Sequence, residues 1–157
     1  MTPLHIANIL SDALNLVLLF LIGQEPLLLP AAMTSGERFR RSAVLYARTA
    51  LAIALPVILA ELGKKYQVWP GRPGFPSGHA TFAASAAMAL VLHRGKAWII
   101  LALPLTLIVG VSLVYAGWHS PVEVSGGIIL GASLSLLVWR LTSRTRHSPE
   151  RSDYSGS

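Results

Sequence analysis

Five long stretches without a charged side chain decide what this chain can fold into. They cover residues 14–23, 49–60, 79–92, 97–121 and 124–139. The stretch from 97 to 121 alone exceeds the roughly 20 apolar residues that cross the hydrocarbon core of a bilayer. The others reach that length when the polar residues at their ends are included. A soluble helical bundle needs polar helix faces, which these stretches almost entirely lack. The sequence therefore predicts an all-α membrane protein, a bundle of about five transmembrane helices.

We expect these helices at about 4–22, 42–62, 77–92, 97–115 and 121–141. Residues 1–142 then form one transmembrane domain, and residues 143–157 form a basic tail that is expected to be disordered. Between the first two helices, the run 27–29 is expected to dip into the membrane interface. A sixth membrane segment or a re-entrant stretch near 24–32 remains an alternative.

Positive charge is distributed in a way that indicates orientation. The net charge of +6 would suggest a nucleic-acid partner in a soluble protein. Here most cations follow the first, third and fifth helices, and so fall on one side of the membrane: Arg38, Arg40, Arg41, Arg94, Lys96, Arg140, Arg144, Arg146 and Arg151. The positive-inside rule makes that side cytoplasmic. We therefore expect a multi-pass protein of the cell (inner) membrane, with a cytoplasmic C-terminus and no nucleic-acid partner.

One extracytoplasmic connection, residues 64–79, combines cations, glycines, prolines and a histidine. Lys65 and Arg72 precede Ser77, Gly78 and His79, which open the third helix. Backbone N–H groups at a helix start attract anions, and nearby cations add to that attraction. A helix over 77–92 rises about 24 Å, less than the core thickness of about 30 Å, so its start is expected at lipid headgroup depth. The pattern predicts a phosphate site there.

A second histidine returns to the same face. His119 lies just before the fifth helix, and Glu123 follows it by one helical turn. A carboxylate beside an imidazole fixes its tautomer and raises its basicity, so His119 can act as a nucleophile or base and His79 as a general acid. Glu123 as a mere helix cap, and His119 as an interfacial side chain, are the simpler alternatives. With these groups engaged, no metal and no other cofactor is expected.

These residues together resemble a known family. Lys65 and Arg72-Pro73 separated by six residues, then Pro76-Ser77-Gly78-His79, then Ser112 with Gly117, His119 and Glu123, are similar to the three signature motifs of the type 2 phosphatidic acid phosphatase (PAP2) superfamily. That superfamily also contains bacterial acid phosphatases and vanadium haloperoxidases. The resemblance covers about residues 62–131.

The resemblance implies a role for each matching residue. Lys65, Arg72, Ser77 and Gly78 would bind phosphate. His79 would be the acid, His119 the nucleophile that forms a phosphohistidine, and Glu123 its orienting partner.

Three features depart from the family pattern. Leu113 stands where the third motif usually has a phosphate-binding arginine, and Glu123 replaces the usual aspartate. Five helices are expected, where membrane members commonly have six. Lys64 is a local candidate to compensate for the missing arginine.

The sequence thus predicts a membrane phosphatase that acts on a lipid phosphate or diphosphate from the extracytoplasmic side, with the site at the ends of the second to fifth helices. The lipid substrate is not ranked, and the oligomeric state is left open. A phosphotransferase would use the same residues. A non-catalytic phospholipid-binding scaffold is the rival from another class, favoured by Leu113, and a haloperoxidase fits a membrane bundle poorly. Asp12 lies within the first membrane helix, where carboxylates are usually paired or functional.

Overall fold

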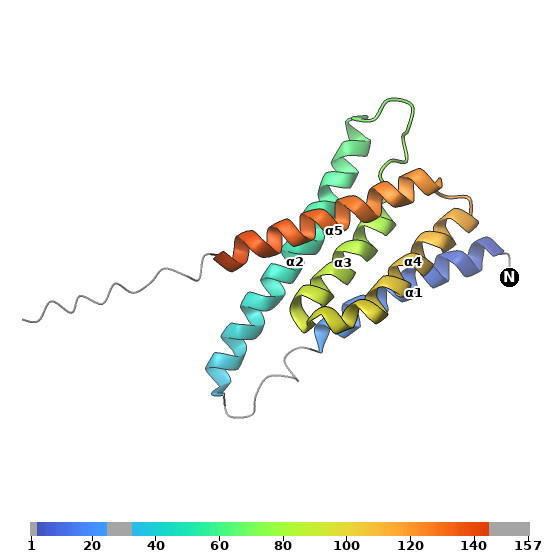
Figure 1. Ribbon diagram of the computed structural model, residues 1–157. Helices are drawn as coiled ribbons and strands as arrows, with labels where there is room; N and C mark the ends of the chain where they lie inside the picture. Colours follow the sequence, from blue (N-terminus) through green and yellow to red (C-terminus); the bar gives the residue numbers. More distant parts are fainter. Residues whose placement is uncertain (1–2, 25–32, 145–157) are drawn as a thin grey trace, which may run out of the picture.

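The computed structural model describes residues 3–24 and 33–144, which form an all-helical bundle (Figure 1). Five α-helices follow one another, and a short 3₁₀ turn, η2, precedes the fourth: α1 (Pro3–Gly23), α2 (Ser35–Lys65), α3 (Gly78–Arg94), η2 (Lys96–Trp98), α4 (Ile99–Tyr115) and α5 (Pro121–Arg144). The predicted all-α class and the five predicted helices are confirmed.

Helix α3 lies at the centre of the bundle. It packs against α1, α2, α4 and α5, most extensively against α5. Six buried alanines give it this position: Ala80, Ala83, Ala84, Ala86, Ala87 and Ala89. Small side chains let neighbouring backbones approach closely, which drives helix association where lipid offers no hydrophobic contrast.

The contact between α3 and α5 depends on two glycines of α5. A Cβ atom on Gly127 would lie 2.6 Å from the carbonyl oxygen of Ser77. A Cβ atom on Gly131 would contact the carbonyl oxygen of Thr81 and lie 3.0 Å from Ser85 Oγ. These two glycines therefore form a close packing face, which fixes the start of α3 against α5.

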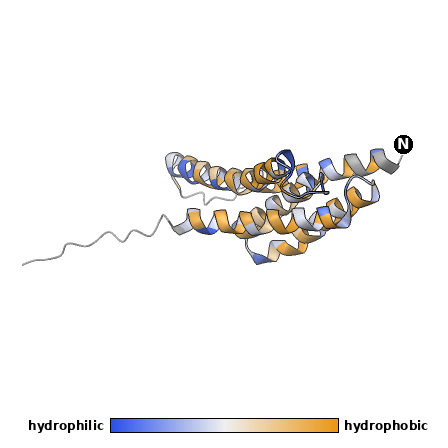
Figure 2. Cartoon of the chain, turned by 90° about the horizontal axis from the view of Figure 1, so that it is seen from above, coloured by the Kyte–Doolittle hydropathy of each residue, from blue (hydrophilic) through white to orange (hydrophobic). Residues whose placement is uncertain are grey.

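The helices have the length and surface of a membrane protein. Within the described residues, three helical stretches are long and apolar enough to span a bilayer, namely Ser35–Lys65, Lys96–Tyr115 and Pro121–Ser143. The apolar part of α1, Ile9–Gly23, is shorter, and α3 has 17 residues. Hydrophobic residues occupy most of the helix lengths in Figure 2, and large ones such as Ile100 remain 79% exposed. The protein is a multi-pass membrane protein.

Helix α2 extends beyond the bounds expected from hydropathy. It begins at Ser35, not near residue 42, because Thr34 and Glu37 form a capping box: Glu37 N donates to Thr34 Oγ1 at 3.3 Å and Thr34 N to Glu37 Oε2 at 3.0 Å. It ends at Lys65, so Lys64 and Lys65 belong to its last turn and not to a loop. Cations are favourable at that end of a helix.

Helix α5 continues to Arg144, about one turn past its expected end. The segment 25–32, where a re-entrant or sixth membrane stretch was considered, lies outside the described residues, as does the tail from residue 145. The division into a transmembrane domain and a basic tail stays a prediction.

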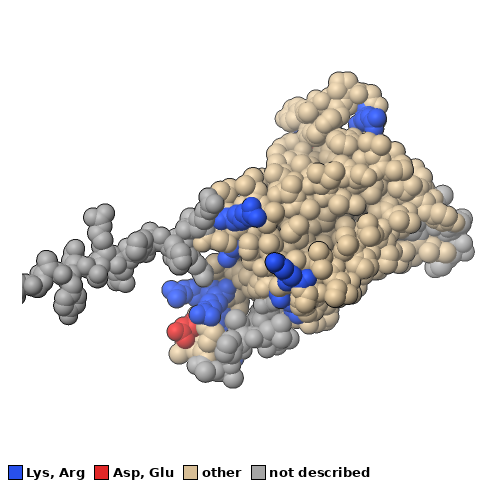
Figure 3. All heavy atoms as spheres, viewed as in Figure 1, with Lys and Arg blue, Asp and Glu red and all other residues tan. Residues whose placement is uncertain are grey.

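Positively charged side chains are distributed unequally between the two ends of the bundle. Helices α2 and α4 begin, and α3 and α5 end, at one end of the bundle. Lys and Arg side chains gather toward the end where α2 begins (Figure 3). The opposite end carries Lys64, Lys65 and Arg72, together with both histidines predicted to be functional.

Candidate active site

The start of α3 is fixed by Ser77. Its side chain caps the helix by accepting a hydrogen bond from Ala80 N at 3.4 Å, and the residue is fully buried. The backbone N–H of Ser77 donates to the carbonyl oxygen of Glu123 at 3.0 Å, which ties the second motif to the start of α5. The first turn of α3 is thereby held beside the residues of the third motif.

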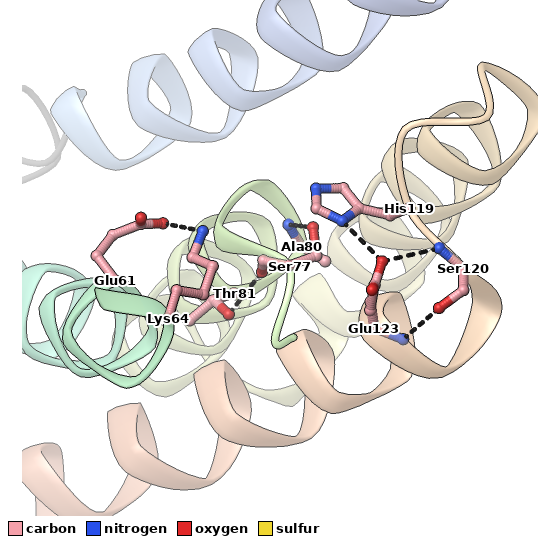
Figure 4. A network of polar contacts seen from close by, with 8 residues as sticks. All are labelled: Glu61, Lys64, Ser77, Ala80, Thr81, His119, Ser120 and Glu123. Carbon is pink, nitrogen blue, oxygen red and sulfur yellow. Dashed lines mark hydrogen bonds and ion pairs between the residues drawn. The ribbon is translucent and has the colours of Figure 1, made fainter. Parts of the chain in front are cut away.

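Two charged side chains from α2 reach this helix start. Lys64 Nζ donates to Glu61 Oε1 at 2.5 Å. A Cβ atom on Gly78 would contact that carboxylate and lie 3.4 Å from Lys64 Nζ. Gly78 is therefore what allows both groups to approach the first turn of α3 (Figure 4). No motif in the sequence singles out Glu61. Its spacing of three residues from Lys64 becomes a signal only once α2 is known to continue to Lys65.

The two cations of the first motif occupy different surroundings. Arg72 is exposed and lines a pocket of about 190 Å³ between the last turn of α2 and the following loop, together with Lys64. Lys65 is also exposed, but it is not among the residues that line this pocket, and its Nζ lies 5.8 Å from the centre of the Tyr66 ring. Trp69 supports the loop by packing on Gly63 and edge-on against Phe75 at 5.1 Å.

His119 and Glu123 form the polar pair that their spacing predicts. His119 Nδ1 lies 3.1 Å from Glu123 Oε2, with side chains 15% and 16% exposed. Because Nδ1 contacts the carboxylate, Nε2 is the ring nitrogen that this pair leaves for a second contact. Figure 4 shows this pair beside the first turn of α3.

Glu123 also caps α5. Its Oε2 accepts from Ser120 N at 3.0 Å, and Ser120 Oγ accepts from Glu123 N at 3.3 Å. Ser120 and Glu123 thus form a capping box, with Pro121 at the first helical position. Glu123 therefore both caps α5 and contacts His119. Gly74 backs the carboxylate, because a Cβ atom there would lie 2.8 Å from Glu123 Oε1.

His79 lies in the first turn of α3, with 45% of its side chain exposed. Its ring meets that of Trp118 edge to face, with centroids 6.4 Å apart, and Trp118 immediately precedes His119. The two histidines therefore belong to the same end of the bundle. On its other side, His79 Nε2 lies 3.9 Å from Asp12 Oδ1 of α1.

The position of the missing arginine is part of the core. Leu113 is 2% exposed and packs in the main cluster of apolar side chains. Its carbonyl oxygen accepts from Trp118 N at 3.1 Å and from His119 N at 3.4 Å, so its backbone still shapes the turn that carries His119. Ser112 Oγ donates to the carbonyl oxygen of Val109 at 2.8 Å, within α4. Neither side chain contributes charge to the site.

Two curated proteins are similar to this chain. One is an undecaprenyl-diphosphatase of Sulfolobus acidocaldarius, 38% identical over 63 residues that make up 40% of this chain and 31% of that protein. The other is the bacitracin transport permease protein BcrC of Bacillus licheniformis, 30% identical over 114 residues, or 63% of this chain and 55% of that protein. The chain thus spans from about a third to just over half of these relatives. No solved structure matches it.

The model of the PAP2 superfamily matches residues 32–147, a stretch that holds every residue of the three motifs as well as α2 to α5. A match over that much of the sequence, with the motifs gathered at one end of the bundle, settles the family. The chain belongs to the PAP2 superfamily.

Proposed function

We propose that this protein is an integral-membrane phosphatase that hydrolyses a lipid phosphate or diphosphate through a phosphohistidine. The observation that carries the proposal is the His119–Glu123 pair at 3.1 Å, tied to the capped start of α3 by the bond from Ser77 N to the Glu123 carbonyl oxygen. A nucleophile with an orienting partner, beside a helix start that favours anions, is the arrangement that phosphoryl transfer needs.

In the first step, His119 Nε2 attacks phosphorus. The N–P bond forms while the bond from phosphorus to the leaving oxygen breaks, and the proton of His79 passes to that oxygen. Glu123 stabilises the positive charge that develops on the His119 ring. Charge on the transferring phosphoryl group is stabilised by Lys64, Arg72 and the N–H groups of the first turn of α3. Lys65 is retained as a contributor on the basis of its motif position.

In the second step, a water molecule attacks the phosphohistidine. Neutral His79 takes a proton from that water as the O–P bond forms and the N–P bond breaks. Inorganic phosphate leaves, and both histidines return to their starting states. A lipid alcohol in place of water would give a phosphotransferase, with the same residues in the same roles.

The lipid assignment rests on where the site lies. The catalytic residues sit at helix ends of a membrane bundle, where a phosphate headgroup meets the bilayer interface. The relative named undecaprenyl-diphosphatase supports a polyprenyl diphosphate as the first substrate to test. The clustering of Arg and Lys at the opposite end supports an extracytoplasmic site under the positive-inside rule.

One observation favours a second candidate. Leu113 removes a cation that the family uses, so a non-catalytic phospholipid-binding protein would tolerate it better than an enzyme would. The retained His79, His119 and Glu123 argue against that function, since binding alone needs no nucleophile with an orienting carboxylate.

The test is phosphate release by the purified full chain in detergent. The panel contains a polyprenyl diphosphate, a polyprenyl monophosphate, phosphatidic acid, phosphatidylglycerol phosphate and a lipid A phosphate. We expect release by wild type, none by His119→Ala, and acid-labile ³²P labelling that His119→Ala abolishes. His93→Gln, at the other end of α3, is the matched control. No release by wild type, or equal release by His119→Ala, would refute the enzyme, and vesicle binding would then support the phospholipid-binding alternative.

A further inference from the structure

The contact between His79 and Asp12 joins the candidate acid to a helix outside the matched family region. Asp12 belongs to α1, and the family model begins at residue 32. Its Oδ1 lies 3.9 Å from His79 Nε2. Among the described residues, Glu61 pairs with Lys64 and Glu123 with His119, so each carboxylate at this end of the bundle has a partner of its own. Asp12 is the one that contacts the acid.

Helix α1 is held firmly enough for this contact to matter. Leu18 and Ile22 are buried in the main apolar cluster, and the helix packs against α3 and α4. Ser11 and Asn15 are 2% and 9% exposed and anchor this turn of α1 in the bundle, whereas the Asp12 side chain is 72% exposed at its edge, where it reaches His79. A carboxylate within a membrane helix is costly unless it is paired. Asp12 has such a partner in His79.

We propose that Asp12 is a positioning residue for His79. It holds the protonated ring by Nε2, which leaves Nδ1 directed to the leaving oxygen of the substrate. In the step described above, the Nδ1 proton passes to that oxygen as the P–O bond breaks, and no proton moves to or from Asp12. This inference rests on the proposed function, because it assigns Asp12 to the same reaction.

The chemistry of the leaving group gives the inference a specific signature. A lipid alcohol leaves as an alkoxide unless it is protonated, so hydrolysis of a monophosphate depends strongly on the acid. A diphosphate expels a lipid phosphate, which is stable as an anion and needs the proton less. Loss of Asp12 should therefore slow monophosphate hydrolysis more than diphosphate hydrolysis. A purely structural role would slow both equally.

The kinetic experiment compares Asp12→Asn, Asp12→Glu and His79→Ala on a polyprenyl monophosphate and the matching diphosphate. Asp12→Asn should lower kcat on the monophosphate by about tenfold or more and on the diphosphate by less than about threefold. Asp12→Glu should restore most of the loss, and Glu37→Gln, far from the site, should change neither rate. Equal loss on both substrates, or no loss from Asp12→Asn where His79→Ala is inactive, would overturn the inference.

A second measurement works without turnover, so failure of the proposed function is distinguishable from failure of this inference. The ¹⁵N spectrum of histidine-labelled protein in detergent, with the His79 signals assigned by loss in His79→Gln, reports the surroundings of each ring nitrogen. Asp12→Asn should move the Nε2 signal of His79 and leave that of His119 in place. An unchanged Nε2 signal would refute the contact even if the wild type hydrolysed every substrate.

Discussion

At the scale of single residues, Glu123 has two tasks that one substitution can separate. Its Oε2 accepts from Ser120 N and contacts His119 Nδ1, at 3.0 and 3.1 Å. Glu123→Gln keeps the size and an amide oxygen for the cap, but it removes the charge that stabilises a charged His119 ring. We expect kcat to fall about a hundredfold or more, with the thermal unfolding midpoint nearly unchanged. Unchanged turnover would show that Glu123 acts only as a cap.

Substitutions of the two adjacent lysines form a matched pair that tests which one contacts phosphate. Lys64 Nζ lies beside the start of α3 and shares a pocket with Arg72, whereas Lys65 is exposed over Tyr66. Lys64→Ala should reduce kcat/KM for a lipid phosphate by about tenfold to a hundredfold, the worth of one charge-assisted contact. Lys65→Ala should cost much less. A larger loss of kcat/KM in Lys65→Ala than in Lys64→Ala would assign the phosphate contact to Lys65, as the motif spacing predicts.

Leu113 is a core residue, so we expect that restoring an arginine at this position would not restore a phosphate contact. Its side chain is 2% exposed among apolar neighbours, so an arginine there has no route to the phosphate site without displacing them. Leu113→Arg should destabilise the protein by about 3 kcal/mol or more in unfolding free energy and bring no gain in rate. Leu113→Met, of similar volume, should cost under about 1.5 kcal/mol. A large gain in rate from the arginine would contradict this placement.

At the scale of elements, the sequence predicts the existence of each helix better than its first and last residues. Charge-free runs mark where lipid surrounds the chain, but a helix can continue into water, as α2 does from Ser35. The Thr34–Glu37 capping box lies several residues before the charge-free run, so a prediction based on hydropathy alone does not reach it. At the other end no proline lies between Pro56 and Pro70, so Lys64 and Lys65 can continue the helix. That extension is what aims Lys64 at α3.

The α3–α5 contact should depend on the absence of a side chain at Gly131. An added Cβ atom would meet the carbonyl oxygen of Thr81, a backbone atom that cannot rotate away. Gly131→Ala should therefore lower stability by about 1–3 kcal/mol, the usual cost of overpacking, and loosen the start of α3. Gly36→Ala, where nothing lies within 4 Å of an added Cβ atom, should be neutral or slightly stabilising. Unfolding in detergent, followed by circular dichroism, measures both; equal midpoints would refute the close contact.

At the scale of the whole molecule, the site combines one contact that local spacing predicts with another that depends on how distant helices pack. The His119–Glu123 pair follows from a separation of four residues at a helix start, and the sequence predicts it directly. The Asp12–His79 contact joins residues of α1 and α3, and it depends on how α1 docks against the bundle. Asp12 was recognised as unusual for a membrane helix, but nothing in its own neighbourhood names its partner. The burial of Leu113 likewise depends on packing from several helices.

The orientation of the bundle decides which lipid pool the site meets. The chain has no cysteine, so a single introduced cysteine is a unique label site. Val68→Cys lies in the loop after α2 and Phe39→Cys near its start, at positions 59% and 78% exposed. If the cation-rich end is cytoplasmic, as the positive-inside rule predicts, a membrane-impermeant maleimide should label position 68 in intact cells and position 39 only after permeabilisation. The reverse pattern would place the site on the cytoplasmic side. Catalysis by His119 would be unaffected, but the substrate would then have to come from the inner leaflet.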